Sequence, residues 1–288
     1  MPSASESKLP HNSLEKTLKE IEGLISLPEI YLKFRQLMDD PNSSNEDFSA
    51  LVGCDPNLSA TVLKIVNSAL FGFPGQIDNI SRAINLLGIG QLHDMVLGTS
   101  AIASLDFPND IVPLKTFWRS SLFSGVLARL LASQLKIQDS ECFFVIGLLH
   151  EIGHLILYAK YREQSIQAIA NFNEGNQTLA VAEQNILGFH YGQAGANLMA
   201  QWRLPTKFQV MTYYQPTPTD APLHPLGTAL IHLAHGYAQK YLVNTGQNIE
   251  RLIVPEAWKI LDLNPKQVEI TLEKAKQVSA DMEKAILR

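Results

Sequence analysis

Residues 150–154 read H-E-x-x-H, and this short run could carry chemistry by itself. On a continuous helix the two histidines lie one turn apart, with the Glu151 carboxylate beside them. Zinc proteases use this arrangement, in which the histidines hold the ion and the glutamate is the general base. Glu174 and Glu183 follow at a spacing that suits a third ligand. Gly153 argues against a protease, because a glycine inside a helix costs about 1 kcal/mol relative to alanine.

Further histidines in the second half of the chain offer another kind of site. His190 begins a predicted helix, and His232 and His235 are three residues apart, so they share one helical face. With His150 they are candidate ligands, since neutral imidazole is the commonest metal ligand in proteins. The alternative interpretation is that all these histidines are structural and that the protein is an adaptor without any ligand.

Helices must position these side chains, because apolar residues recur with a helical period and no run alternates as a strand would. Asp55-Pro56 and the capping-box spacing of Ser43 and Glu46 predict helix starts. A long helix over 140–158 is apolar almost all round, which places it in the core. The other predicted helices cover 80–87, 91–105, 113–134, 163–173, 178–187, 191–202, 206–214 and 223–243, and Pro255 and Pro265 open the last two.

The predicted fold is all-α, with a small N-terminal bundle and a larger C-terminal bundle. Residues 1–23 form a polar N-terminal segment, 24–106 the N-terminal helical subdomain, and 111–288 the larger subdomain with the C-terminal helices. The turn residues and proline of Asp106–Asp110 predict the boundary. A chain of 288 residues has room for this organisation.

Composition and charge exclude several classes of protein. Hydrophobic residues make up 46% and charged residues 18%, which excludes a disordered chain. A net charge of -5 argues against a broad electrostatic contact with nucleic acid. The polar N-terminus lacks the apolar region of a secretory signal, and the apolar stretch 142–158 is interrupted by polar residues and shorter than a membrane span of about 20 residues. We therefore expect a soluble, cytoplasmic protein without nucleic-acid or membrane partners.

Several motifs follow one another in a fixed order, at 27–30, 55–58, 66–72, 80–88, 117–119, 147–153, 188–190 and 202–205. In order and spacing they resemble the HDOD domain family over roughly residues 24–240. The resemblance implies a bacterial signalling module related to the HD superfamily of metal-dependent phosphohydrolases, which includes the HD-GYP cyclic di-GMP phosphodiesterases. HDOD domains are generally regarded as inactive hydrolases, found alone or joined to response-regulator, kinase or cyclic-nucleotide-turnover domains.

The resemblance also implies which parts of an active HD site remain, and it makes the larger subdomain HD-like. His150-Glu151 falls where active relatives have a His-Asp pair, and His190 matches a downstream helix histidine. The active site holds one or two cations, which acidify a bound water and bind phosphoryl oxygens. Glu151 is one methylene longer than aspartate, which displaces a carboxylate that must bridge ions roughly 3.5–4 Å apart.

Other positions of the active pattern are replaced. Ser120 stands where an early histidine is expected and His235 where a late aspartate is expected. Tyr213-Tyr214 replaces a further histidine, and a phenol with a pKa near 10 is not a normal ligand at neutral pH. No GYP motif follows. The resemblance therefore predicts no catalytic residues, metal or cofactor, but a remnant ligand-binding pocket of His150, Glu151, His190, His235, Ser120 and Tyr214.

The leading hypothesis is a non-catalytic signalling module that meets its partners in trans: response regulators, kinases or cyclic-nucleotide-turnover proteins, by the family resemblance. Its pocket would sense a small ligand such as a nucleotide, since an emptied active site often keeps its concavity. One alternative is a phosphohydrolase with residual activity at a single metal, in which Glu151 is a ligand. The less favoured alternative is the zinc protease, in which Glu151 is a base.

Overall fold

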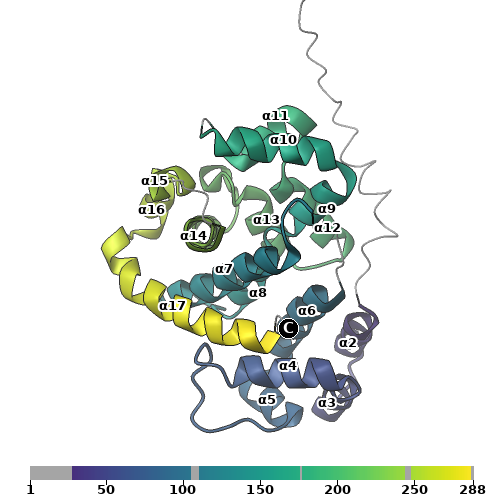
Figure 1. Ribbon diagram of the computed structural model, residues 1–288. Coiled ribbons are helices and arrows are strands. Elements are labelled where there is room, and N and C mark those ends of the chain that lie inside the picture. Colours follow the sequence, from purple (N-terminus) through teal and green to yellow (C-terminus); the bar gives the residue numbers. More distant parts are fainter. Residues whose placement is uncertain (1–27, 105–109, 176, 244–247, 287–288) are drawn as a thin grey trace, which may run out of the picture.

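The computed structural model describes residues 28–104, 110–175, 177–243 and 248–286. Within these ranges helices are joined by turns and loops, and no described residue belongs to a strand. Figure 1 shows a smaller group of helices, α2–α6, beside a larger group that begins with α7. The prediction of an all-helical fold is therefore confirmed. The predicted polar segment 1–23 and most of the predicted boundary at 106–110 lie outside the described residues.

Three helices of the smaller group start at side-chain caps that directly precede them in the sequence. Asp55 accepts hydrogen bonds from the first backbone amides of its helix at 2.9 and 3.0 Å, as predicted. The predicted capping box at Ser43 is wrong by one residue: the box is formed by Ser44 and Asp47, because the Ser43 amide is still bonded to Asp40 in the preceding turn. The five helices are α2 (Glu29–Asp39), α3 (Asn45–Gly53), α4 (Pro56–Val66), α5 (Ile80–Leu87) and α6 (Ile89–Ser104).

The larger group is built around α7, which packs against α8, α14 and α17. Its contact with α8 is unusually close, because a Cβ on Gly125 would lie 2.4 Å from the Phe144 carbonyl oxygen and one on Gly147 would lie 2.6 Å from the Gly125 Cα. The helices are α7 (Leu114–Gln134), α8 (Cys142–Leu149), α9 (Ile152–Lys160), α10 (Arg162–Asn173), α11 (Leu179–Leu187), α12 (Tyr191–Gln201), α13 (Thr206–Tyr214), η1 (Pro218–Asp220), α14 (Pro225–Ala238), the π-helical η2 (Gln239–Val243), α15 (Ile249–Leu252), α16 (Pro255–Leu261) and α17 (Pro265–Ile286).

Two long predicted helices are divided in the structure. The helix predicted over 140–158 breaks at His150 and Glu151, which lie in a turn between α8 and α9. The helix predicted over 223–243 begins at Pro225 and changes to a π-helix at Gln239. Both breaks lie at polar side chains that turn toward the interior, whereas the surrounding apolar residues give a helical pattern in either case.

The stretch Cys142–Lys160 meets the length and hydropathy criteria of a membrane span, with a mean hydropathy of 1.7. In the structure 94% of this apolar window is buried inside the protein. A helix that the rest of the chain already covers has the character of a core helix. The apolar character of α8 and α9 is thus accounted for by packing.

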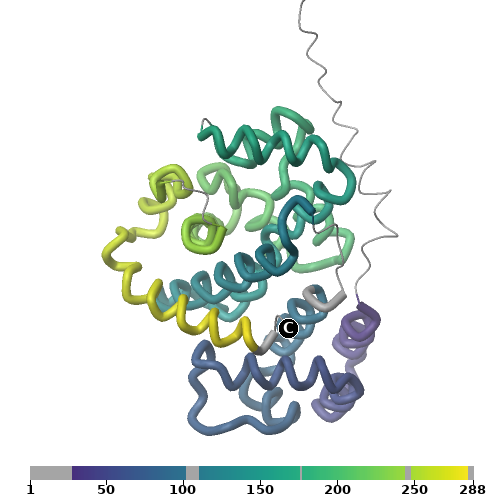
Figure 2. The backbone as a smooth tube through the Cα atoms, in the orientation of Figure 1, coloured from purple at the N-terminus to yellow at the C-terminus, as the bar shows by residue number. Residues whose placement is uncertain are grey.

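The two groups of helices share one hydrophobic core. Phe71, between α4 and α5, lies under the guanidinium of Arg129 on α7, with 3.6 Å between the Arg129 Cζ and the ring centroid. A further contact between the two groups is made by α17, which packs along α7 and reaches α4, as the tube in Figure 2 shows. The contacts of α17 come from a buried stripe, Val268, Leu272, Ala275, Val278 and Met282.

Candidate functional site

The turn between α8 and α9 brings His150 and Glu151 to the centre of the larger group. Close packing of α9 on α12 positions this turn, since a Cβ on Gly153 would lie 1.9 Å from the Tyr191 carbonyl oxygen and 2.6 Å from the Gly195 nitrogen. No side chain fits in that contact. Glycine is therefore required at position 153 for packing, which explains a residue that is unfavourable inside a helix.

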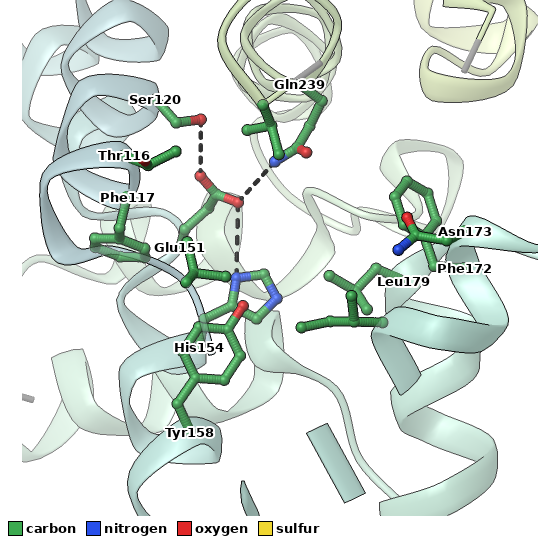
Figure 3. A pocket seen from close by; sticks show the side chains of 13 residues that line it. Thr116, Phe117, Ser120, Glu151, His154, Tyr158, Phe172, Asn173, Leu179 and Gln239 are labelled. Carbon is green, nitrogen blue, oxygen red and sulfur yellow. Dashed lines mark hydrogen bonds and ion pairs between the residues drawn. The ribbon is translucent and has the colours of Figure 1, made fainter. Parts of the chain in front are cut away.

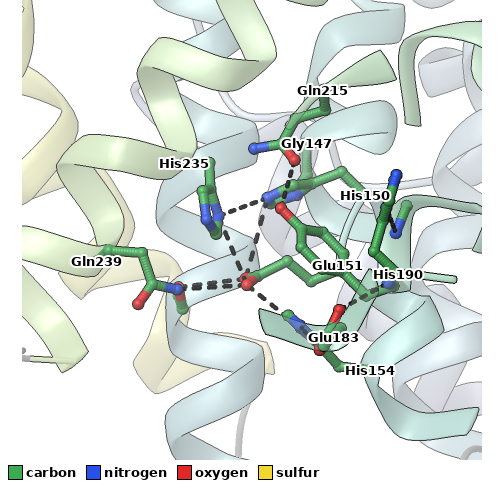
Figure 4. A network of polar contacts seen from close by, with 12 residues as sticks. Gly147, His150, Glu151, His154, Glu183, His190, Gln215, His235 and Gln239 are labelled. Carbon is green, nitrogen blue, oxygen red and sulfur yellow. Dashed lines mark hydrogen bonds and ion pairs between the residues drawn. The ribbon is translucent and has the colours of Figure 1, made fainter. Parts of the chain in front are cut away.

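Glu151 lies at the centre of the polar contacts (Figure 4). It is 3% exposed, and its carboxylate accepts hydrogen bonds from the Ser120 hydroxyl at 3.4 Å and from the Gln239 amide at 3.3 Å. Its Oε1 also lies 3.5 Å from His235 Nδ1 and 3.6 Å from His154 Nδ1. Side chains from α7, α9, α14 and η2 therefore converge on one carboxylate.

His150 has a different partner at each ring nitrogen. Its Nδ1 lies 2.7 Å from the Gly147 carbonyl oxygen, which can only accept, so Nδ1 carries the proton. Its Nε2 lies 3.0 Å from His235 Nδ1 and 3.9 Å from Glu151 Oε2. The bond to the backbone thus fixes the ring and directs its Nε2 toward Glu151 and His235.

His154 takes part in a separate ion pair. Its Nε2 lies 3.1 Å from Glu183 Oε1, and Glu183 Oε2 accepts the Tyr191 backbone N–H at 2.8 Å. The imidazole also stacks on the Tyr191 ring, with 4.0 Å between centroids. His150 faces His235 while His154 faces Glu183, so the two histidines of the H-E-x-x-H run are not directed at one point. This geometry does not match the zinc-protease arrangement.

Burial and neighbouring charges shift the pKa values of this cluster in different directions. Burial lowers the pKa of His235 to about 3 and lowers that of His150 as well. Burial also opposes the charge on His154, but Glu183 and Glu151 raise its pKa above the ordinary value. For Glu151, burial raises the pKa but the surrounding imidazoles and Ser120 lower it further, leaving it below the ordinary value. At neutral pH, neutral His150 and His235 thus flank an ionised Glu151, and His154 is the imidazole of the cluster whose pKa is raised.

A cavity of about 390 Å³ opens beside Glu151 (Figure 3). Glu151, Ser120, His154 and Gln239 line one side, and Phe172, Asn173 and Leu179 from α10 and α11 line the opposite side. We call it the main cavity. A second cavity of about 50 Å³ shares Phe172, Leu179 and Gln239 with it and reaches His235 and Pro216. The predicted loop after α13 therefore begins at the wall of this smaller cavity.

The structure separates two predicted pocket residues from this cluster. His190 caps α12: its Nδ1 accepts the Gly192 amide at 3.1 Å, and burial lowers its pKa to about 4. Tyr214 packs against Tyr213 on α13, with 4.6 Å between ring centroids, and lines neither cavity. The four other predicted residues, His150, Glu151, His235 and Ser120, lie together. Glu174, the other candidate third ligand, is exposed at the end of α10.

Two further residues show what the sequence pattern could and could not indicate. His232 is buried, with Nδ1 2.8 Å from the Gln215 carbonyl and Nε2 accepting the Val254 amide at 3.0 Å, so it has a structural role. Gln239 was missed as a site residue. A helix continued regularly from His235 would place position 239 on the same face one turn later, so its spacing was an available signal.

The donor set of the cluster suits a single metal ion. Among the described residues, one atom each of His150, Glu151 and His235 lie within 4.8 Å of one another. Two neutral imidazole nitrogens and one carboxylate oxygen are suitable ligands for one divalent transition metal ion. The set does not suit two ions, because Ser120 is a poor ligand and the Nδ1 of His190 is bonded to α12. One ion therefore fits these residues and a dinuclear centre does not.

Fold and site together define an all-helical protein in which a His–acid pair in a helix break meets a histidine from a later helix. The family model described as HDOD domain matches residues 24–218. This match covers more than half of the chain, and the chain belongs to the HDOD family.

A curated relative matches this chain over a limited region. An uncharacterized protein of Treponema pallidum (strain Nichols) is 28% identical over 189 residues, which are 64% of this chain and 36% of the relative. The chain thus spans little more than a third of the length of that relative.

Solved structures share the fold. An HDOD domain protein of unknown function from Geobacter sulfurreducens has a TM-score of 0.75 at 20% identity, covering 96% of this chain and 99% of its own. A proposed phosphohydrolase from Shewanella amazonensis SB2B has a TM-score of 0.74 at 20% identity, with coverages of 96% and 99%. A proposed signal transduction protein from Marinobacter aquaeolei VT8 has a TM-score of 0.67 at 19% identity, covering 99% of this chain and 68% of its own. At these identities the likeness concerns the fold.

Proposed function

We propose that this chain is a non-catalytic HDOD module of bacterial signal transduction, which acts through contacts with signalling proteins. The observation that supports it is the state of the polar groups beside the main cavity. Glu151 is engaged by Ser120 and Gln239, and His150 by His235, so these groups are directed at one another. A hydrolase needs such groups directed at a substrate or at its metal ions. The remaining concavity then serves to bind a small regulatory ligand.

The two predicted subdomains have different roles in this proposed function. The HD-like subdomain, 111–288, contains the cavity, and the N-terminal subdomain, 24–106, provides a second surface for partners. We propose a cytoplasmic location and partners in trans, namely response regulators, kinases or cyclic-nucleotide-turnover proteins. The family resemblance and the name of the Marinobacter protein support this class of partner.

The experiment that tests the non-catalytic role is a hydrolysis assay on metal-loaded protein. Protein is loaded in turn with zinc, manganese and iron and given bis(p-nitrophenyl) phosphate and cyclic di-GMP. We expect no turnover above that of Glu151→Gln protein, whose side chain has the same shape without the charge. Turnover that is lost in both Glu151→Gln and His235→Ala would overturn the proposal. Glu174→Gln, on the exposed end of α10, is the matched control.

A single-metal phosphohydrolase is the second candidate, and one specific observation favours it. His150 Nε2, His235 Nδ1 and Glu151 lie 3.0–3.9 Å from one another on the wall between the two cavities. An ion held there would supply an acidified water and a charge for phosphoryl oxygens. Metal analysis separates this candidate from the zinc protease. In the phosphohydrolase, His154→Ala leaves the metal bound and Glu151→Gln weakens it, whereas in a protease His154→Ala loses the metal and Glu151→Gln keeps it.

A further inference from the structure

The lining of the main cavity is uneven in charge. Among the described residues that line it, Glu151 is a carboxylate and His154 is an imidazole, while none is a lysine or arginine. His154 is already engaged by Glu183 at 3.1 Å. A phosphorylated ligand would therefore bring its negative charge to a buried carboxylate without a lysine or arginine in the lining to receive it.

Two buried acidic side chains share one imidazole at this wall. Glu151 Oε1 and Glu183 Oε1 lie 3.6 and 3.1 Å from the two ring nitrogens of His154. The other contacts that the Glu151 carboxylate makes with the cavity lining are dipoles, namely the Ser120 hydroxyl at 3.4 Å and the Gln239 amide at 3.3 Å. Among the described lining residues, no lysine or arginine occupies this acceptor.

The rest of the cavity is apolar and partly aromatic. Phe117 and Tyr158 flank Glu151 on one side, and Phe172 and Leu179 lie across the space from it (Figure 3). Ile169 also lines the cavity. A volume of about 390 Å³ is in the range of small-molecule sites. Such walls suit an apolar or aromatic body, and ring faces also attract a cation.

We infer that the main cavity binds a small organic cation, a primary amine on an aromatic or aliphatic body. The ammonium group donates to the Glu151 carboxylate and to the carbonyl oxygen of Gln239, whose amide nitrogen already bonds to Glu151. The body lies between Phe117 and Phe172. This inference rests on the proposed function, because it names the class of the regulatory ligand, and it differs from the nucleotide expected from the sequence.

Three probes that share one ring test the charge preference. Benzylamine, benzyl alcohol and benzyl phosphate are titrated by calorimetry into the full chain, after treatment with a chelator to remove metal. We expect benzylamine to bind about tenfold or more tightly than benzyl alcohol, since one charge-assisted hydrogen bond is lost, and benzyl phosphate not to bind. Glu151→Gln should abolish the preference for the amine while binding of the alcohol is unchanged.

Two variants keep the test decisive. Leu179→Trp fills the cavity from α11 without changing Glu151, and it should block binding of both the amine and the alcohol. This variant still tests the inference if Glu151→Gln fails to fold. Glu250→Gln, on the exposed face of α15, is the control and should bind as the unmodified chain does.

The outcomes distinguish the inference from the proposed function. If benzyl phosphate binds more tightly than benzylamine, and Leu179→Trp blocks it, the charge class is wrong while the ligand-binding module stands. If amine and alcohol bind equally, the role of Glu151 is wrong. If no probe binds, the inference is overturned together with the ligand-binding part of the proposed function, and the hydrolysis assay still decides the non-catalytic part.

Discussion

The helix ends of the N-terminal bundle and those at the α8–α9 turn are stabilised in different ways. In the N-terminal bundle, side chains such as Ser44, Asp55 and Asn79 accept the first amides of their own helices. At the α8–α9 turn, α9 begins without a side-chain cap. Glu151, in the turn, is engaged by Ser120 and Gln239, which lie 31 and 88 residues away in the sequence.

This difference shows which interactions determine the structure of each region. Local caps define a helix whatever surrounds it, and each contributes about 1 kcal/mol. The α8–α9 turn depends instead on close backbone packing and on buried polar pairs, which are sensitive to the removal of one partner. Substitutions at the turn should therefore lower the free energy of unfolding more than substitutions of caps do. For the buried polar pairs, the size of this loss should depend on pH.

The largest effect is expected for Gly153→Ala. The new Cβ would lie 1.9 Å from the Tyr191 carbonyl oxygen, so α9 must move away from α12, and we expect the free energy of unfolding to fall by roughly 3 kcal/mol or more. Gly90→Ala in α6 is the matched control, since a Cβ there meets nothing within 4 Å; it should be neutral or stabilise by up to about 1 kcal/mol. Denaturant unfolding measures both, and equal effects would contradict the comparison.

The Glu183–His154 pair should give a smaller, pH-dependent effect. The pKa of His154 is raised in the folded state, so its contribution is complete below the ordinary value of 6.5 and is lost as pH rises through the raised value. Below pH 6.5 we expect Glu183→Gln to reduce the free energy of unfolding by about 2 kcal/mol. The difference from the unmodified protein should narrow at higher pH. A difference independent of pH would show that His154 does not carry the proton.

The smallest effect is expected at a cap of the N-terminal bundle. Asp55 accepts the Asn57 and Leu58 amides, and Asp55→Ala should cost about 1 kcal/mol of unfolding free energy. Asp55→Ser keeps an acceptor at the cap and should recover most of this loss. Thermal or denaturant unfolding of the two variants checks this, and an equal loss in both would assign the effect to something other than capping.

Local signals explain how much of the fold the sequence could predict. The helix over 80–87 was predicted with its observed ends, because Asn79 and Gly88 mark them, and Pro265 marks the start of α17. The break at His150 had no such signal, since α8 is apolar on every side and its surroundings read as one helix. Tertiary packing at Gly153 decides this break, and packing has no local pattern.

The candidate site shows the same difference between what the sequence indicates and what tertiary packing decides. The family resemblance grouped His150, Glu151, His235 and Ser120, which the structure brings together. It also grouped His190, whose Nδ1 instead accepts an amide of its own helix, a use that any cap-forming side chain at that position could serve. For His154, spacing offered both Glu174 and Glu183 as partners, and the structure places Glu183 against it. Spacing could not decide between the two, because the partner reaches His154 from another helix.

The path of α17 has a consequence for the order in which the chain folds during synthesis. This helix, Pro265–Ile286, packs on both α7 and α4, although α4 leaves the ribosome some two hundred residues earlier. Until Val268 and the buried residues that follow it are made, the apolar surfaces they cover on both bundles stay open to water. A ribosome paused before this helix would therefore hold a nascent chain whose two bundles meet only in part, through contacts such as that between α6 and α8, with the surfaces for α17 still exposed.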